Sequence, residues 1–172
     1  MKWISLIVLA LLVGADQVPT IELKDATRVG GIEFVPLSVE VRPVKMRRPA
    51  WTSDEFFKSA ESYTVLTYRL TNVTDEQVID PSVLQGMMED QYGNIHHQVL
   101  GYMVCPQCIL DEPDQSRELL PGDSQRLVAV FQAPKIKKAD LFTIKVSFVK
   151  DNKNRRGEVW VLFKRSDFGK TD

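Results

Sequence analysis

The chain has 172 residues, of which 44% are hydrophobic and 26% are charged, and its formal net charge is −1. This length and this balance suit one globular domain that buries a substantial core. A chain so close to neutral lacks the basic excess that nucleic-acid binding requires, so we expect no nucleic-acid partner.

The first fifteen residues have the order of a secretory signal peptide. Lys2 gives a short basic start, residues 4–13 are apolar except for Ser5, and Gly14 and Ala15 are small. The apolar run is shorter than the roughly 20 residues that span a bilayer. We therefore expect residues 1–15 to be removed and residues 16–172 to form one secreted or periplasmic domain without a transmembrane segment. No cysteine lies at the cleavage site, which argues against a lipid anchor.

Short alternating runs separated by turn residues predict an all-β fold. Residues 141–149 are the clearest case, because apolar and polar side chains alternate from Phe142 to Phe148. Pro36 and Pro43 limit another extended run to an edge or a bend, since proline cannot donate to a ladder. The runs that we expect to be strands include residues 32–45, 63–72, 125–132, 141–149 and 157–164. The pattern predicts an immunoglobulin-like antiparallel β-sandwich of about seven to eight strands.

Residues 45–51 (KMRRPAW) combine basic charge with an aromatic ring. Arg47, Arg48 and Trp51 are side chains of the kinds that anchor protein interfaces. The alternative is a solvated connection in which Trp51 packs onto the core. These three residues are the predicted interaction surface, and its partner would be an unidentified protein or envelope component.

Residues 52–62 break the strand pattern. Thr52 and Glu55 have the spacing of a capping box, which predicts one short helix from Thr52 to about Ser62. Packing of Phe56 and Phe57 would have to stabilise so short a helix.

Cys105 and Cys108 are the only two cysteines, and they lie in an insert over residues 100–118. In an exported protein we expect them to form a disulfide. The bond closes a four-residue loop, so chain entropy gives it only about 2 kcal/mol. It would hold the insert locally and would not join the two sheets. An intermolecular bridge and free thiols remain alternatives.

Two other readings of the cysteine pair stay open. A thiol-redox pair is disfavoured by Pro113 and by the acidic residues around it, which do not favour a reactive thiolate. A zinc or copper site would use His96 and His97 with Cys105 and Cys108, and the nearby Met103 is a further copper ligand. Adjacent strand residues point to opposite faces, however, so the two histidines would not easily bind one ion.

Three turn motifs carry a family resemblance: LTYRLTNVTDE at residues 66–76, EDQYGN at residues 89–94 and LLPGDS at residues 119–124. Their order resembles that of a group of exported bacterial immunoglobulin-like domains of unknown function, the DUF4352 and MPT63-like group. The resemblance implies a secreted β-sandwich and brings no catalytic residues with it. The first motif also contains a formal N-glycosylation sequon at Asn72, which fits a turn equally well.

The residues point to no catalytic constellation, and no nucleophile elbow of the G-x-S-x-G type occurs. We therefore expect a non-enzymatic binding module that needs no cofactor. The alternative is a metal-binding or thiol-redox protein centred on the histidine and cysteine pairs.

Overall fold

The regular structure is almost entirely β-strand in the computed structural model, which describes residues 18–47, 56–75, 77–80, 83–99, 109–110, 118–135 and 138–169. The strands are β1 (Thr20–Glu22), β2 (Thr27–Val29), β3 (Ile32–Arg47), β4 (Phe56–Asn72), β5 (Val83–Asp90), β6 (Ile95–His97), β7 (Ser124–Gln132), β8 (Leu141–Val149) and β9 (Arg156–Lys164). Helical structure in these ranges is limited to η2 (Arg165–Asp167) and to residues 109–110.

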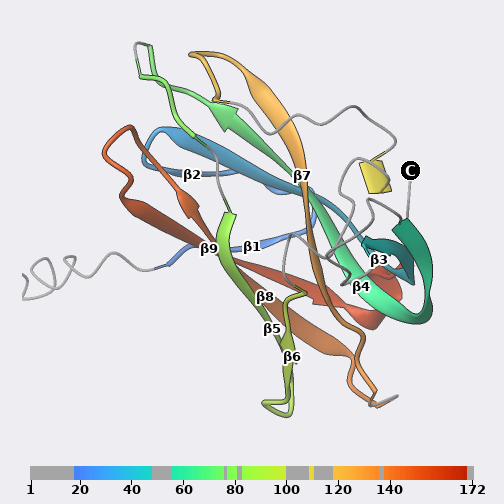
Figure 1. Ribbon diagram of the computed structural model, residues 1–172. Coiled ribbons are helices and arrows are strands. Elements are labelled where there is room, and N and C mark those ends of the chain that lie inside the picture. Colours follow the sequence, from blue (N-terminus) through green and yellow to red (C-terminus); the bar gives the residue numbers. More distant parts are fainter. Residues whose placement is uncertain are drawn as a thin grey trace, which may run out of the picture.

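The strands form two sheets that face each other (Figure 1). The first sheet has the order β1-β9-β8-β5-β6, and the second has the order β2-β3-β4-β7. Every pairing is antiparallel except that of β1 with β9, which is parallel. The predicted all-β antiparallel sandwich is therefore confirmed. The count is higher than the expected seven to eight because three-residue strands such as β1 and β2 are too short to show a period.

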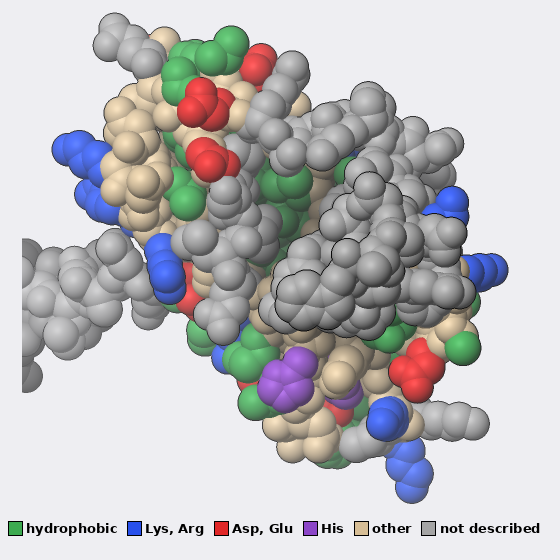
Figure 2. Space-filling model, viewed as in Figure 1, with side chains coloured by type: hydrophobic (Ala, Val, Ile, Leu, Met, Phe, Trp, Pro, Cys, Tyr) green, Lys and Arg blue, Asp and Glu red, His purple; other side chains and the backbone are tan. Residues whose placement is uncertain are grey.

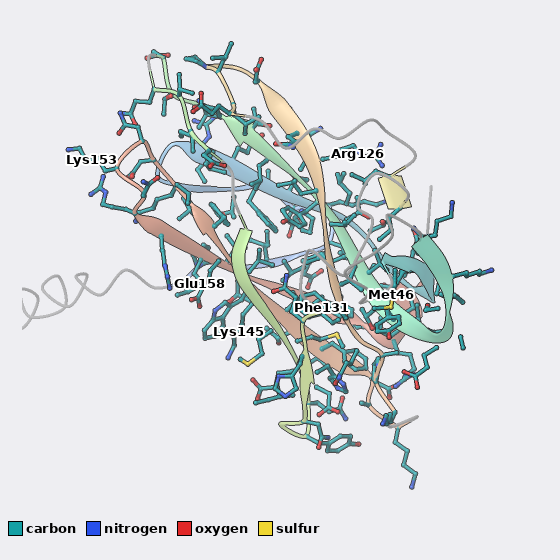
Figure 3. All side chains as sticks on the ribbon, viewed as in Figure 1. Met46, Arg126, Phe131, Lys145, Lys153 and Glu158 are labelled. Atoms are coloured by element: carbon teal, nitrogen blue, oxygen red, sulfur yellow. The ribbon has the colours of Figure 1, made fainter. Side chains whose placement is uncertain are left out.

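The core lies between the inner faces of the two sheets. Phe34 of β3 stacks on Phe148 of β8, with ring centroids 5.8 Å apart, and so joins one sheet to the other. Phe34 also stacks on Tyr68 of β4 at 5.2 Å. Phe131 of β7 is fully buried and lies between the sheets in Figure 3. Packing of this kind supplies most of the folding free energy of a small domain.

After β6 the chain crosses from the first sheet to the edge of the second. Gln98 pairs with Phe131 of β7, and the Val99 amide donates to the Val130 carbonyl at 2.8 Å. This crossing covers part of the β7 edge, which would otherwise present unpaired backbone groups. It also brings Val99, which directly precedes residue 100, to the outer side of the second sheet.

The β3–β4 hairpin corrects the predicted helix. Residues 56–62 are not helical but belong to β4, where Phe56 pairs with Arg47 and Phe57 with Met46. The predicted start of the helix, residues 52–55, lies outside the described residues. The local preference for a helix was overridden here because β3 offers antiparallel partners on both sides of a register shift between Pro43 and Lys45, and tertiary pairing is favoured over a short helix. No helix in the described ranges is long and apolar enough to cross a membrane.

The buried hydroxyl of Tyr68 generates a prediction about stability. This side chain is fully buried, and its hydroxyl has no hydrogen-bond partner among the described residues. Burial raises the pKa of Tyr68 far above its ordinary value, because the phenolate would lose its hydration. The unfolded chain ionises at about pH 10, so the wild type should lose stability as the pH rises above that value.

We expect Tyr68→Phe to raise the free energy of unfolding by about 1 kcal/mol at neutral pH, since it removes an unpartnered buried hydroxyl. The variant should also lose less stability above about pH 10 than the wild type does. Urea denaturation at both pH values measures each effect. Tyr92→Phe is the matched control, because Tyr92 is 60% exposed and should change neither quantity. A large destabilisation by Tyr68→Phe at neutral pH would contradict the assignment.

Candidate functional site

The first turn motif of the sequence is part of the scaffold. Asn72 is fully buried at the end of β4. Its side-chain nitrogen donates to the Gln77 carbonyl at 2.6 Å and to the Leu119 carbonyl at 2.9 Å. Its side-chain oxygen accepts from the amide and the hydroxyl of Thr74, at 3.0 and 2.7 Å. A side chain held in this way is inaccessible in the folded protein, so the sequon at Asn72 is explained as a turn.

The third motif closes against the same residue. The Asn72 amide donates to the Asp123 carbonyl, and the Gly122 amide donates to the Asn72 carbonyl, each at 2.9 Å. Gly122 has a φ of +84°, a conformation that glycine adopts without strain. The two motifs are thus one interlocked pair of turns that leads the chain into β7.

The second motif is a turn built around Asp90. Its carboxylate accepts from the amides of Tyr92 and Asn94 and from the Asn94 side chain. Burial opposes ionisation, but these hydrogen bonds and the nearby His96 outweigh it and hold the pKa of Asp90 below its usual range. Nε2 of His96 lies 3.6 Å from the Asp90 carboxylate. All of these contacts fix the β5–β6 turn.

The predicted metal site is only partly described. His96 is buried and His97 is exposed on β6, because neighbouring residues of a strand point to opposite faces. Cys105, Cys108 and Met103 lie outside the described residues, so the disulfide and the metal alternative both remain predictions. Within the described ranges, no three His, Cys, Asp or Glu side chains are grouped to hold a metal ion.

The predicted interaction surface begins at the end of β3. The backbone of Arg47 pairs with that of Phe56, and Arg48 and Trp51 lie outside the described residues. Met46, which directly precedes Arg47, belongs to a second apolar cluster on the outer face of the β2-β3-β4-β7 sheet. We call it the outer cluster; its members are Val44, Met46, Tyr63, Val65, Val99, Ile109, Val128 and Val130.

The outer cluster brings two distant segments of the chain together. Met46 directly precedes Arg47, and Ile109 directly follows Cys108. Nη2 of Arg42 also donates to the Ile109 carbonyl at 3.4 Å. Ile109, within the insert, therefore packs beside the end of β3. In Figure 3, Met46 and Arg126 lie on this side of the molecule.

The opposite side carries a site that the sequence analysis missed. An open depression of about 390 Å³ lies on the outer face of the β1-β9-β8-β5-β6 sheet. Thr143 and Lys145 of β8, Glu89 of β5 and Trp160 of β9 line it, together with the β5–β6 turn. We call it the outer-face depression. Lys145 and Glu158 mark this side in Figure 3.

Charged contacts organise the outer-face depression. Nζ of Lys145 lies 3.5 Å from a Glu89 carboxylate oxygen and 4.7 Å from the centroid of the Trp160 ring. The indole nitrogen of Trp160 donates to the Glu158 carboxylate. The signal that could have found this site is Trp160 itself, a large aromatic at an outward position of a strand whose neighbour β8 is polar on that face.

The basic end of the β8–β9 hairpin is explained by the fold. Figure 2 shows blue side chains gathered over this end of the molecule. Asp151, buried at its base, accepts from the amides of Lys153 and Arg155 and pairs with the Arg155 guanidinium. Burial raises the pKa of Asp151, but these contacts outweigh it and lower the pKa below the ordinary value. The Asp151 carboxylate therefore stabilises the β8–β9 turn from inside.

Comparisons with known proteins support the fold. No family model matches the chain, and no curated protein matches its sequence. The yjhA protein from Bacillus subtilis is similar in structure, with 12% identity and a TM-score of 0.51, over 81% of this chain and 98% of that one. An uncharacterised β-sandwich protein from Clostridium difficile 630 has 9% identity and a TM-score of 0.51, over 87% and 95% of the two chains.

The secreted protein MPT63 from Mycobacterium tuberculosis has 8% identity and a TM-score of 0.51, over 87% of this chain and 99% of that one. At such identities the likeness shows a shared β-sandwich fold alone. The predicted resemblance to MPT63-like proteins is confirmed at that level, and membership of the DUF4352 group stays a prediction.

The interlocked turns predict a large cost for losing Asn72. We expect Asn72→Ala to lower the free energy of unfolding by about 2–4 kcal/mol, because the Gln77 and Leu119 carbonyls lose their shared donor inside the protein. Urea denaturation measures the change. Asn152→Ala is the control, since Asn152 is exposed in the β8–β9 turn and should alter stability by less than about 0.5 kcal/mol. Equal effects of the two substitutions would refute the structural role of Asn72.

Proposed function

We propose that this protein is an exported, non-catalytic binding module whose partner is a protein or envelope component. The observation that supports this function best is the outer cluster, which packs the end of β3 beside Ile109. Arg47, Arg48 and Trp51 follow β3 directly, and Cys108 directly precedes Ile109. The segment after β3 and the insert, which both depart from a plain sandwich, are therefore each attached to the outer cluster. Two segments can form one binding face only if they lie close together.

A non-catalytic role is supported by the groups whose pKa is shifted. Strongly shifted groups often mark active sites. Among the described residues, the clear shifts are those of Tyr68, Asp90 and Asp151. Tyr68 lies in the core, and the two carboxylates are satisfied by turn hydrogen bonds. Each shift therefore has a structural cause that requires no catalytic role.

Export is supported by the predicted signal peptide at residues 1–15. A likeness in fold to the secreted protein MPT63 is consistent with it. The expected Cys105–Cys108 disulfide belongs to the same proposal, since such bonds persist in oxidising compartments.

We expect the purified exported protein to have an intact mass two hydrogens below that of the reduced chain. Cys105 and Cys108 should resist alkylation until a reductant is added, because both sulfurs are already bonded. Native mass spectrometry of the same sample should find no bound zinc or copper. Two alkylated thiols would overturn the disulfide. A stoichiometric metal that Cys105→Ser removes would in addition support the metal-binding alternative.

The proposed binding face of Arg47, Arg48 and Trp51 is tested by placing an aromatic photo-crosslinking amino acid at position 51. The full chain is expressed in the organism that naturally makes it. We expect a discrete adduct with one envelope protein or polymer, because Trp51 is the predicted anchor. Arg47→Ala with Arg48→Ala in the same chain should reduce the adduct at least about tenfold, the effect of losing about 1.4 kcal/mol of affinity.

The matched control carries the photo-crosslinker at Lys153, which is exposed on the β8–β9 turn, away from both proposed binding sites. An adduct of equal yield from both positions would reflect random collision and would contradict the proposed face. No adduct at position 51 would contradict it as well.

A further inference from the structure

The outer-face depression has a defined architecture in the register of its strands. Thr143 of β8 lies between Glu89 of β5 and Leu162 of β9. Two residues further along β8, Lys145 lies between Met87 and Trp160. The small Thr143 side chain is therefore surrounded by longer side chains that share its outward face. This arrangement accounts for a hollow on an otherwise continuous sheet.

Hydrogen bonds hold the walls of the outer-face depression in place before any ligand arrives. The Gln91 side chain accepts from the amides of Asp140 and Leu141, at 3.1 and 3.0 Å, and ties the β5–β6 turn to the start of β8. The Trp160 amide donates to the Pro19 carbonyl at 2.9 Å, and its indole nitrogen donates to Glu158. A binding surface that is ordered in advance loses little entropy when it binds.

The charges of the outer-face depression balance. Among the lining residues, Lys145 and Glu89 are the charged groups at the surface, and they face each other at 3.5 Å. The nearby Glu158 carboxylate is occupied by the Trp160 indole. Asp90 also borders the depression, but its carboxylate is buried and satisfied by the turn. An anionic ligand would meet Glu89 and a cationic ligand would meet Lys145. A neutral ligand with many hydroxyl groups can accept from Lys145 and donate to Glu89 at the same time.

We propose that the outer-face depression binds a neutral sugar unit within a polysaccharide. Lys145 covers one side of the Trp160 ring, and the part of the ring that lines the depression provides an apolar surface for the C–H groups of a pyranose. Lys145, Glu89 and Thr143 provide polar partners for its hydroxyls. The volume of about 390 Å³ is in the range of small-ligand sites and lies on an open sheet face, so the polymer can continue on both sides.

This site does not rest on the binding face proposed above. The outer-face depression belongs to the β1-β9-β8-β5-β6 sheet, and the outer cluster covers the other sheet. Either one can fail while the other stands.

The test is an NMR titration of the purified exported protein with four neutral tetrasaccharides: maltotetraose, cellotetraose, mannotetraose and chitotetraose. We expect at least one to shift the Trp160 indole and the Thr143 amide, with a Kd below about 5 mM. Tetragalacturonate, the anionic counterpart, should bind at least about tenfold more weakly, because Glu89 repels it.

Variants distinguish specific binding at the outer-face depression from nonspecific binding of sugars to the protein. Trp160→Ala should weaken binding at least about tenfold, and Lys145→Met, which keeps the length of the side chain, at least about threefold. Lys153→Met on the exposed β8–β9 turn is the matched control and should leave binding unchanged. Lys145→Met keeps the test valid if Trp160→Ala fails to fold.

Three results would overturn the proposal. The first is that none of the neutral tetrasaccharides shifts the Trp160 indole at about 10 mM, a concentration at which even weak binding is visible. The second is that tetragalacturonate binds more tightly than every neutral sugar. The third is that Lys153→Met weakens binding as much as Lys145→Met does.

Discussion

The apolar outer face of the β2-β3-β4-β7 sheet depends on a break in strand register within β3. Between Pro36 and Ser38 of β3 the pairing with β4 shifts by one residue. Before the shift, Ile32 and Phe34 point into the core; after it, Val39 does. An extra residue moves every later side chain to the other face. Val44 and Met46 therefore face outward and form the outer cluster with Val65 and Val130. Without that shift Val44 and Met46 would not extend the outer cluster along β3.

A second constraint fixes the ends of the sandwich. Asn72 joins the turn after β4 to the turn before β7, and Asp90 organises the β5–β6 turn. The motifs that carry the family resemblance are therefore structural, because each supplies the polar partner that a tight buried turn needs. Proteins that share only about a tenth of their residues with this chain have a similar β-sandwich fold. Such motifs contain no information about a ligand, and function has to be sought on the sheet faces.

The sequence predicted the fold where a period of two continues over many residues. The run at residues 141–149 is β8 residue for residue, and Leu66, Tyr68 and Leu70 of β4 point into the core as expected. The predicted helix was wrong because residues 56–62 find a ladder partner in β3, a contact that no local signal contains. The outer-face depression was missed for a similar reason. Trp160, Lys145 and Glu89 are far apart in sequence, and only the register of β5, β8 and β9 makes them neighbours.

The contact between Trp160 and Lys145 serves both the stability of the sheet and the proposed sugar site. This contact is a cross-strand pair that stabilises the sheet by about 0.2–1 kcal/mol, which accounts for an outward aromatic in structural terms. The same contact leaves the ammonium of Lys145 between an aromatic ring and a carboxylate. A ligand hydroxyl can accept from that ammonium without separating the ion pair, because Lys has three donors. Binding then adds contacts to a pair that the fold already maintains, so the scaffold need not be strained to create the site.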